Sequence, residues 1–198
     1  MKYPEFFDQV PTITLKDDLS EFLGSIDDGI VEFSYLDIVK TAGHSCPTVA
    51  GAYIMCMVGL KELYKDELPV RGEIMIEFAS DEKDGVAGVI ANVMSQITGA
   101  TNTLGFKGIG GEYIRHSLVS FNAEINSSVK FTRNDTNESV ELVYNADAIP
   151  AKPAQAELMQ KLLRNFATDD EAREFKKLWQ GRVKDIFSNI DKVITKVS

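Results

Sequence analysis

The feature that most constrains this fold is a helix start at Cys46-Pro47, followed by a long apolar run. Proline suits the first position of a helix, because its φ is already helical and that position needs no N–H donor. Cys46 then stands where an N-cap residue stands. Residues 49–63 are mostly apolar and rich in small side chains, which is typical of a helix buried among other elements. We therefore expect a central, buried helix beginning at Pro47.

The same helix start carries two chemically active side chains. His44 and Cys46 lie two residues apart, in a chain with two histidines and two cysteines. A thiol at a helix N-terminus faces unpaired N–H groups and the positive end of the helix dipole, and both favour the thiolate. Thiolate binds metals and attacks electrophiles, while an imidazole adds a nitrogen ligand or a proton carrier. The pattern predicts a functional site on His44 and Cys46.

Size, charge and cysteine content exclude several classes of protein. The 198 residues suffice for one sizeable core, with or without an appendage. The net charge of −9 argues against nucleic acid or an anionic membrane as a partner. No apolar run reaches membrane-spanning length, and residues 1–8 are too polar for a signal-peptide core. Cys46 and Cys56 lie too far apart along one helix to bridge, so we expect reduced thiols and a cytoplasmic protein.

Hydrophobic periodicity divides the chain into a core and a tail. Helical spacing predicts helices over residues 15–23, 36–41 and 86–98, and alternation predicts strands over residues 30–35, 74–79, 117–121, 128–132 and 139–144. The last two strands form a predicted hairpin. Together with an N-terminal arm, these elements make a core domain over residues 1–148.

Residues 149–198 form a predicted helical C-terminal extension. Pro153 opens its first helix, and Thr168 with Glu171 forms a capping box before a second helix. An apolar stripe then continues to Val197. Because such a stripe is unstable in water, we expect it to pack on the chain's own core, on a second copy or on a partner.

The central stretch resembles a known family. Residues 41–48 read Thr-Ala-Gly-His-Ser-Cys-Pro-Thr, and they are similar to the Phe-His-Gly-His-x-Cys-Pro-Gly phrase of the family named after the E subunit of formylmethanofuran dehydrogenase (FmdE). The resemblance covers roughly residues 30–145. It implies an α+β core with helices packed on a mostly antiparallel sheet, commonly as a homodimer. It also implies a metal, usually zinc, near the His-x-Cys motif.

The chain departs from the family pattern at two places. The family's first histidine falls at Ala42, and its Cys-x-x-Asp phrase falls at Val89 and Asn92. A zinc-finger tail, which some members carry, is absent because no cysteine follows Cys56.

A zinc site on His44 and Cys46 needs further ligands, because zinc takes three or four protein ligands. We expect Asp84 and His116 as additional ligands. Wider candidates are Asp81, Glu82 and Glu112, or the same residues of a second subunit. The predicted cofactor is a transition metal, with zinc first and iron or nickel as alternatives.

Three other functions stay open. In the first, the His-x-Cys-Pro motif supplies an axial ligand to a haem, with Met55 and Met57 lining its pocket. In the second, Cys46 is the nucleophile of a cysteine-dependent enzyme, with His44 or His116 as its base. In the third, the chain is a non-catalytic dimeric interaction module. The sequence indicates no substrate and no small-molecule ligand.

Overall fold

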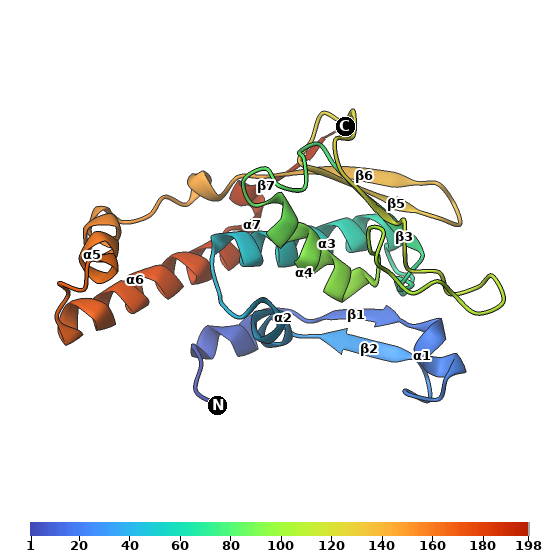
Figure 1. The fold of residues 1–198 in the computed structure, drawn as a ribbon, viewed down its shortest axis with the longest axis horizontal. Coiled ribbons are helices and arrows are strands. Elements are labelled where there is room, and N and C mark those ends of the chain that lie inside the picture. The colour runs from blue at the N-terminus through green and yellow to red at the C-terminus, as the bar shows by residue number, and fades with distance from the viewer. Residues whose placement is uncertain (198) are drawn as a thin grey trace.

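The computed structural model describes residues 1–197, which form seven α-helices, two 3-10 helices and seven β-strands. The helices are α1 (Asp18–Phe22), α2 (Tyr35–Ala42), α3 (Pro47–Tyr64), α4 (Ala87–Thr98), α5 (Pro153–Leu163), α6 (Asp169–Phe187) and α7 (Ile190–Val193), with 3-10 turns η1 (Glu5–Gln9) and η2 (Ala146–Ala148). The strands are β1 (Ile13–Lys16), β2 (Ile30–Phe33), β3 (Ile74–Phe78), β4 (Val119–Ser120), β5 (Val129–Arg133), β6 (Ser139–Tyr144) and β7 (Ile194–Val197). Helices pack on two mostly antiparallel sheets, so the predicted α+β fold is confirmed (Figure 1).

Helix α3 is the centre of the core, as the apolar run predicts. Cys46 is its N-cap residue and Pro47 is its first residue. All eight side-chain positions from Val49 to Cys56 are buried, because α3 packs on α4, α6, β5 and β6. Each large apolar side chain fully buried in this way contributes about 1.5–3 kcal/mol to folding. None of the helices in residues 1–197 combines the length and hydrophobicity needed to cross a membrane.

The larger sheet has the strand order β4-β3-β5-β6-β7. β5 and β6 form the predicted hairpin, with Phe131 opposite Val140. β4 is parallel to β3, and the other pairings are antiparallel. The helical pattern predicted up to Val197 is wrong at its end, because residues Ile194–Val197 pair with β6 and extend the sheet.

The predicted helix over residues 15–23 is wrong in its first half. Leu15 lies in β1 opposite Val31 of β2, and its side chain is fully buried. The helix begins only at Asp18, because the carboxylate of Asp17 accepts a hydrogen bond from the Ser20 N–H and caps it. The strand pairing therefore overrides a helical spacing of leucines.

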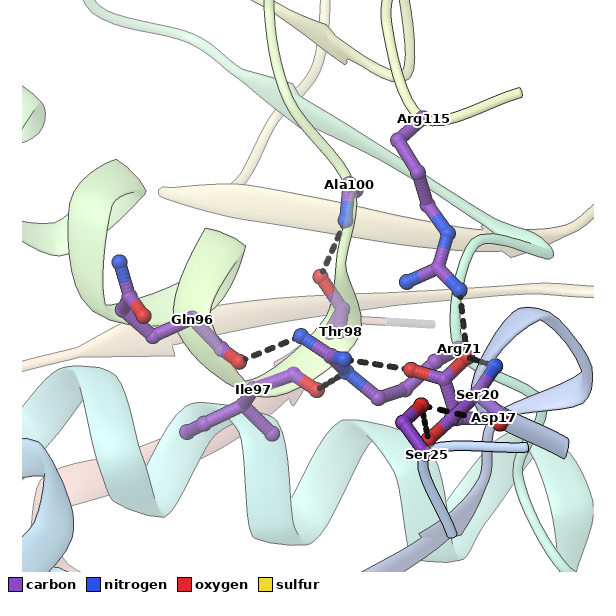
Figure 2. Close-up of polar contacts among 9 residues, drawn as sticks. All are labelled: Asp17, Ser20, Ser25, Arg71, Gln96, Ile97, Thr98, Ala100 and Arg115. Atoms are coloured by element: carbon purple, nitrogen blue, oxygen red, sulfur yellow. Dashed lines mark hydrogen bonds and ion pairs between the residues drawn. The ribbon is translucent and has the colours of Figure 1, made fainter. Parts of the chain in front are cut away.

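Asp17 also centres a buried ion cluster, which Figure 2 shows. Its carboxylate accepts from Arg71 Nη1 at 2.6 Å and from Arg115 Nη2 at 2.8 Å. Arg71 also donates to the carbonyl oxygens of Gln96 and Ile97 at the C-terminal end of α4, the end of a helix that attracts cations. The cluster ties the N-terminal region to α4 and to the loop that contains Arg115.

The C-terminal extension packs on the core mainly through its second half. Val183 and Ile186 of α6 are fully buried. The rings of Phe187 and Tyr35 pack edge to face, with 4.7 Å between their centroids. The predicted capping box at the start of α6 is present. Figure 1 shows α5 and the beginning of α6, in orange, projecting away from both sheets. The extension is thus partly a core element and partly an exposed helical hairpin.

Candidate functional site

The candidate site lies on a tight turn between two helices. Helix α2 ends at Ala42 and is capped by Gly43, whose φ of 76° is left-handed and suits glycine. Helix α3 begins at Pro47. The three residues His44, Ser45 and Cys46 therefore connect two elements that the core holds in place.

Cys46 lies at the N-terminal end of α3, as predicted. Its Sγ accepts a hydrogen bond from the Val49 N–H at 3.4 Å, and the residue is 9% exposed. The sulfur therefore occupies the N-cap position, at the end of the helix where backbone N–H groups lack intrahelical partners. In residues 1–197 no hydrogen bond joins this sulfur to either histidine, so the structure shows no Cys-His pair of the kind that activates a nucleophile.

His44 is exposed beside the buried cysteine. Its Nδ1 lies 3.0 Å from the carbonyl oxygen of Ala42. In the neutral tautomer whose Nδ1–H donates to this oxygen, the lone pair lies on Nε2, and no hydrogen bond joins Nε2 to another group within residues 1–197. A backbone carbonyl that holds one ring nitrogen in this way is common around metal-binding histidines, because it fixes the tautomer and the ring orientation.

A cleft of about 770 Å³ opens beside His44, along the outer face of α4. Its lining includes Ala42, His44, Glu82, Lys83, Val89, Asn92, Gln96, Thr101, Asn102, Thr103 and Leu104. Three of these, Ala42, Val89 and Asn92, are the positions where the chain departs from the FmdE pattern. The structure therefore brings those three positions and His44 to one cleft, which we call the α4 cleft.

The other predicted ligands lie elsewhere. Asp84 is exposed and lines a separate pocket of about 360 Å³ with Met55 and Tyr144. His116 is half-buried, and its Nδ1 lies 2.9 Å from the Ser117 hydroxyl.

The acidic loop before α4 holds its carboxylates through local contacts. A hydrogen bond from the Asn122 side chain, with another from the Lys83 N–H, holds the pKa of Asp81 below its usual range. Glu82 lines the α4 cleft, and Glu112 is exposed. Among residues 1–197, no three His, Cys, Asp or Glu side chains gather closely enough to hold a metal ion. Within this part of the chain there is thus no assembled metal site, although an imidazole and a thiol are ligand types that zinc and other borderline or soft metals take.

The residues proposed as a haem pocket do not gather around His44. Met55 lines the pocket near Asp84, and Met57 lines a third pocket beside Leu60. His44 lines neither of these two pockets. Cys56 is fully buried, and burial raises the pKa of its thiol, which suits a small apolar core residue.

Sequence reasoning missed the residues that hold the turn from outside. Ser45 is buried, and helix α6 contacts it through Trp179 and Gln180. On the other side, Tyr144 donates from its hydroxyl to the carbonyl oxygen of Pro47 at 2.6 Å, and burial raises the pKa of that hydroxyl. In the sequence, the apolar stripe that includes Trp179 was the only indication that α6 packs on the core near this turn.

Comparison with known proteins supports the resemblance. The model of the family described as "FmdE, Molybdenum formylmethanofuran dehydrogenase operon" matches residues 41–196. The match begins at the C-terminal end of α2, just before the turn that carries His44, and continues through α6 into β7, so it includes most of the C-terminal extension. No curated protein is significantly similar to the chain.

Proposed function

Because the chain belongs to the FmdE family, we propose that it binds a transition metal ion, zinc first, through His44 and Cys46. The family description names the molybdenum formylmethanofuran dehydrogenase operon, and we propose an accessory role beside the molybdenum enzyme of such an operon. Its compartment is the cytoplasm, where the two free cysteines stay reduced.

The observation that carries this proposal is the arrangement of both donors on one turn. The Cys46 sulfur accepts an N–H bond at a helix N-terminus, and the His44 ring has one nitrogen beside a carbonyl and the other available. The first arrangement places the sulfur among the backbone N–H groups of the first turn of α3, and the second fixes the orientation of the ring, as a carbonyl does around metal-binding histidines. A bound ion would supply Lewis-acid chemistry at the edge of the α4 cleft.

We propose that a second copy of the chain completes the coordination. Two protein ligands are fewer than zinc requires, and His44 is exposed at an open cleft rather than enclosed by its own chain. His116 and Asp84 are accessible donors that a partner subunit could bring to it. Light scattering after size-exclusion chromatography should then show a dimer that requires the metal. A monomer that holds a full equivalent of zinc would contradict the dimeric site.

The direct test is elemental analysis of freshly purified protein, compared with two variants. Cys46→Ser keeps an N-cap acceptor but removes the thiolate, and His44→Gln removes the imidazole. Each should lose most of the bound metal, while Cys56→Ala should retain it because Cys56 lies inside α3. Full metal occupancy in Cys46→Ser would overturn the assignment.

Measurements on the same preparation distinguish the alternative functions. A Soret band in the absorption spectrum would show that the cofactor is a haem and not a single metal ion. A metal-free protein whose Cys46 reacts rapidly with electrophiles would favour a thiol enzyme. A stable dimer with neither property would favour an interaction module.

A further inference from the structure

Helix α6 holds the residue between the two proposed ligands. The carbonyl oxygen of Ser45 accepts from Trp179 Nε1 at 2.9 Å and from Gln180 Nε2 at 3.2 Å. The Ser45 hydroxyl donates to Gln180 Oε1 at 3.0 Å and lies 2.9 Å from the Tyr35 hydroxyl. The amide of Gln180 thus holds both the side chain and the main chain of Ser45.

These contacts come from a part of α6 that is fixed to the core. Val183, about one turn further on, and Ile186, about two turns further on, are fully buried. Arg182 donates to the carbonyl oxygens of Ala146 and Ile149, which ties α6 to the connection after β6. Trp179 and Gln180 therefore hold Ser45 from a rigid support.

We infer that Trp179 and Gln180 are positioning residues, which hold the His44–Cys46 turn in the geometry that its two ligands need. The peptide of Ser45 links the imidazole to the thiol, so a rotation of this peptide changes how the two donors converge. Groups that hold a ligand without touching the metal commonly change metal affinity by about 10- to 100-fold when removed. The consequence for affinity rests on the proposed function, while the positioning itself can be measured without metal.

The metal-free test is the rate at which iodoacetamide alkylates Cys46, followed by mass spectrometry of its peptide. Trp179→Phe keeps an aromatic ring, although a smaller one, and removes the N–H donor, and Gln180→Leu removes both amide contacts. Gln160→Leu is the matched control on the exposed face of α5. Cys56, which is fully buried, reports on general unfolding in the same sample.

We expect alkylation of Cys46 to be about tenfold faster in Trp179→Phe and Gln180→Leu, with Gln160→Leu unchanged and Cys56 unmodified in all. Rates within twofold of the wild type in both variants would overturn the inference. Equal acceleration at Cys56 would also overturn it, because the contacts would then hold the whole fold and not the turn.

A second measurement uses Co²⁺ as the probe, with its dissociation constant taken by competition against a chromophoric chelator. We expect the constant to rise about tenfold in Trp179→Phe and Gln180→Leu, and to stay unchanged in Gln160→Leu. Unchanged constants in both variants would overturn the positioning role. A wild-type protein that binds no Co²⁺ would refute the proposed function, and the alkylation rates would still decide the inference.

Discussion

Removing the charge of Asp17 should destabilise the protein far more than removing any exposed carboxylate. Asp17 is 4% exposed and receives Arg71 at 2.6 Å and Arg115 at 2.8 Å. Without it, Arg71 keeps its bonds to the carbonyl oxygens at the end of α4. When the whole carboxylate is removed, as in Asp17→Ala, Arg115 keeps no partner for Nη2, and its buried Nε already has none among the described residues. Asp17→Asn keeps Oδ1 as the acceptor for the Ser20 N–H and Arg115 Nη2 but places an amide NH2 opposite Arg71 Nη1. Its cost therefore lies mainly in the lost negative charge between two guanidinium groups and in the broken bond to Arg71.

The magnitude follows from two contributions. Breaking a buried ion pair by removing one partner costs about 3–5 kcal/mol. Losing an N-cap acceptor costs about 1 kcal/mol more. Asp17→Asn keeps an acceptor for the Ser20 N–H, so we expect a loss of about 3 kcal/mol. Asp17→Ala loses the cap as well, so we expect about 4 kcal/mol.

The assay is urea unfolding followed by far-ultraviolet circular dichroism, with the free energy extrapolated to water. Asp27→Asn is the control, because Asp27 is exposed on the turn after α1 and surface changes of this kind stay within about 0.5 kcal/mol. A loss below about 1 kcal/mol in both Asp17 variants would refute the reasoning.

The same cluster predicts a pH dependence. Burial opposes ionisation of Asp17, but the Ser20 N–H, Arg115 and Arg71 outweigh it, so the folded-state pKa lies below its usual value. A lowered folded-state pKa means that the stabilisation is complete above the unfolded-state pKa, about 3.9, and is lost as the pH falls through the folded-state value. The stability difference between wild type and Asp17→Asn should therefore shrink below about pH 4. A difference that stays constant down to pH 2 would contradict this sign.

Three further predictions concern single positions. Gly51→Ala should destabilise the protein by about 2 kcal/mol, although alanine has the higher helix propensity. The reason is that the new Cβ would overlap the Tyr144 ring. An increase in melting temperature would contradict this. Gly181→Ala should stabilise it by up to about 1 kcal/mol, since apart from its chain neighbours and the backbone of its own helix no atom lies within 4 Å of that Cβ; a lower urea midpoint would argue against it. In metal-free protein, Cys46→Ser should leave the free energy of unfolding within about 0.5 kcal/mol, because serine is a good N-cap; a loss above 2 kcal/mol, by urea unfolding, would assign Cys46 a structural role.

Much of the architecture follows from local chemistry in the sequence. The start of α3 at Cys46-Pro47 and the capping box of Thr168 with Glu171 each satisfy backbone groups within a few residues. Gly99, with a φ of 73°, ends α4 for the same kind of local reason. These features do not depend on distant parts of the chain, and the structure confirms them.

Strand pairing is where the local pattern fails. Leu15 fits a helical spacing with the leucines that follow, yet it pairs with Val31 across the smaller sheet. The apolar stripe that ends at Val197 has helical spacing, yet its last four residues form strand β7, which pairs with β6. In both cases hydrogen bonds to a strand elsewhere in the chain outweigh a short helical preference, which is weak in so few residues.

For the candidate site too, some features follow from the local sequence and others depend on the tertiary structure. The sequence alone proposes His44 and Cys46 as candidate ligands, because a thiol at a helix start and an imidazole two residues away are chemically reactive groups wherever the chain folds. Only the tertiary structure placed His44 on the α4 cleft and kept Asp84 on another pocket. It also brought Trp179 and Gln180, 134 and 135 positions away from Ser45, onto the turn. Contacts at such separations depend on how whole elements pack, and no local pattern of residues encodes them.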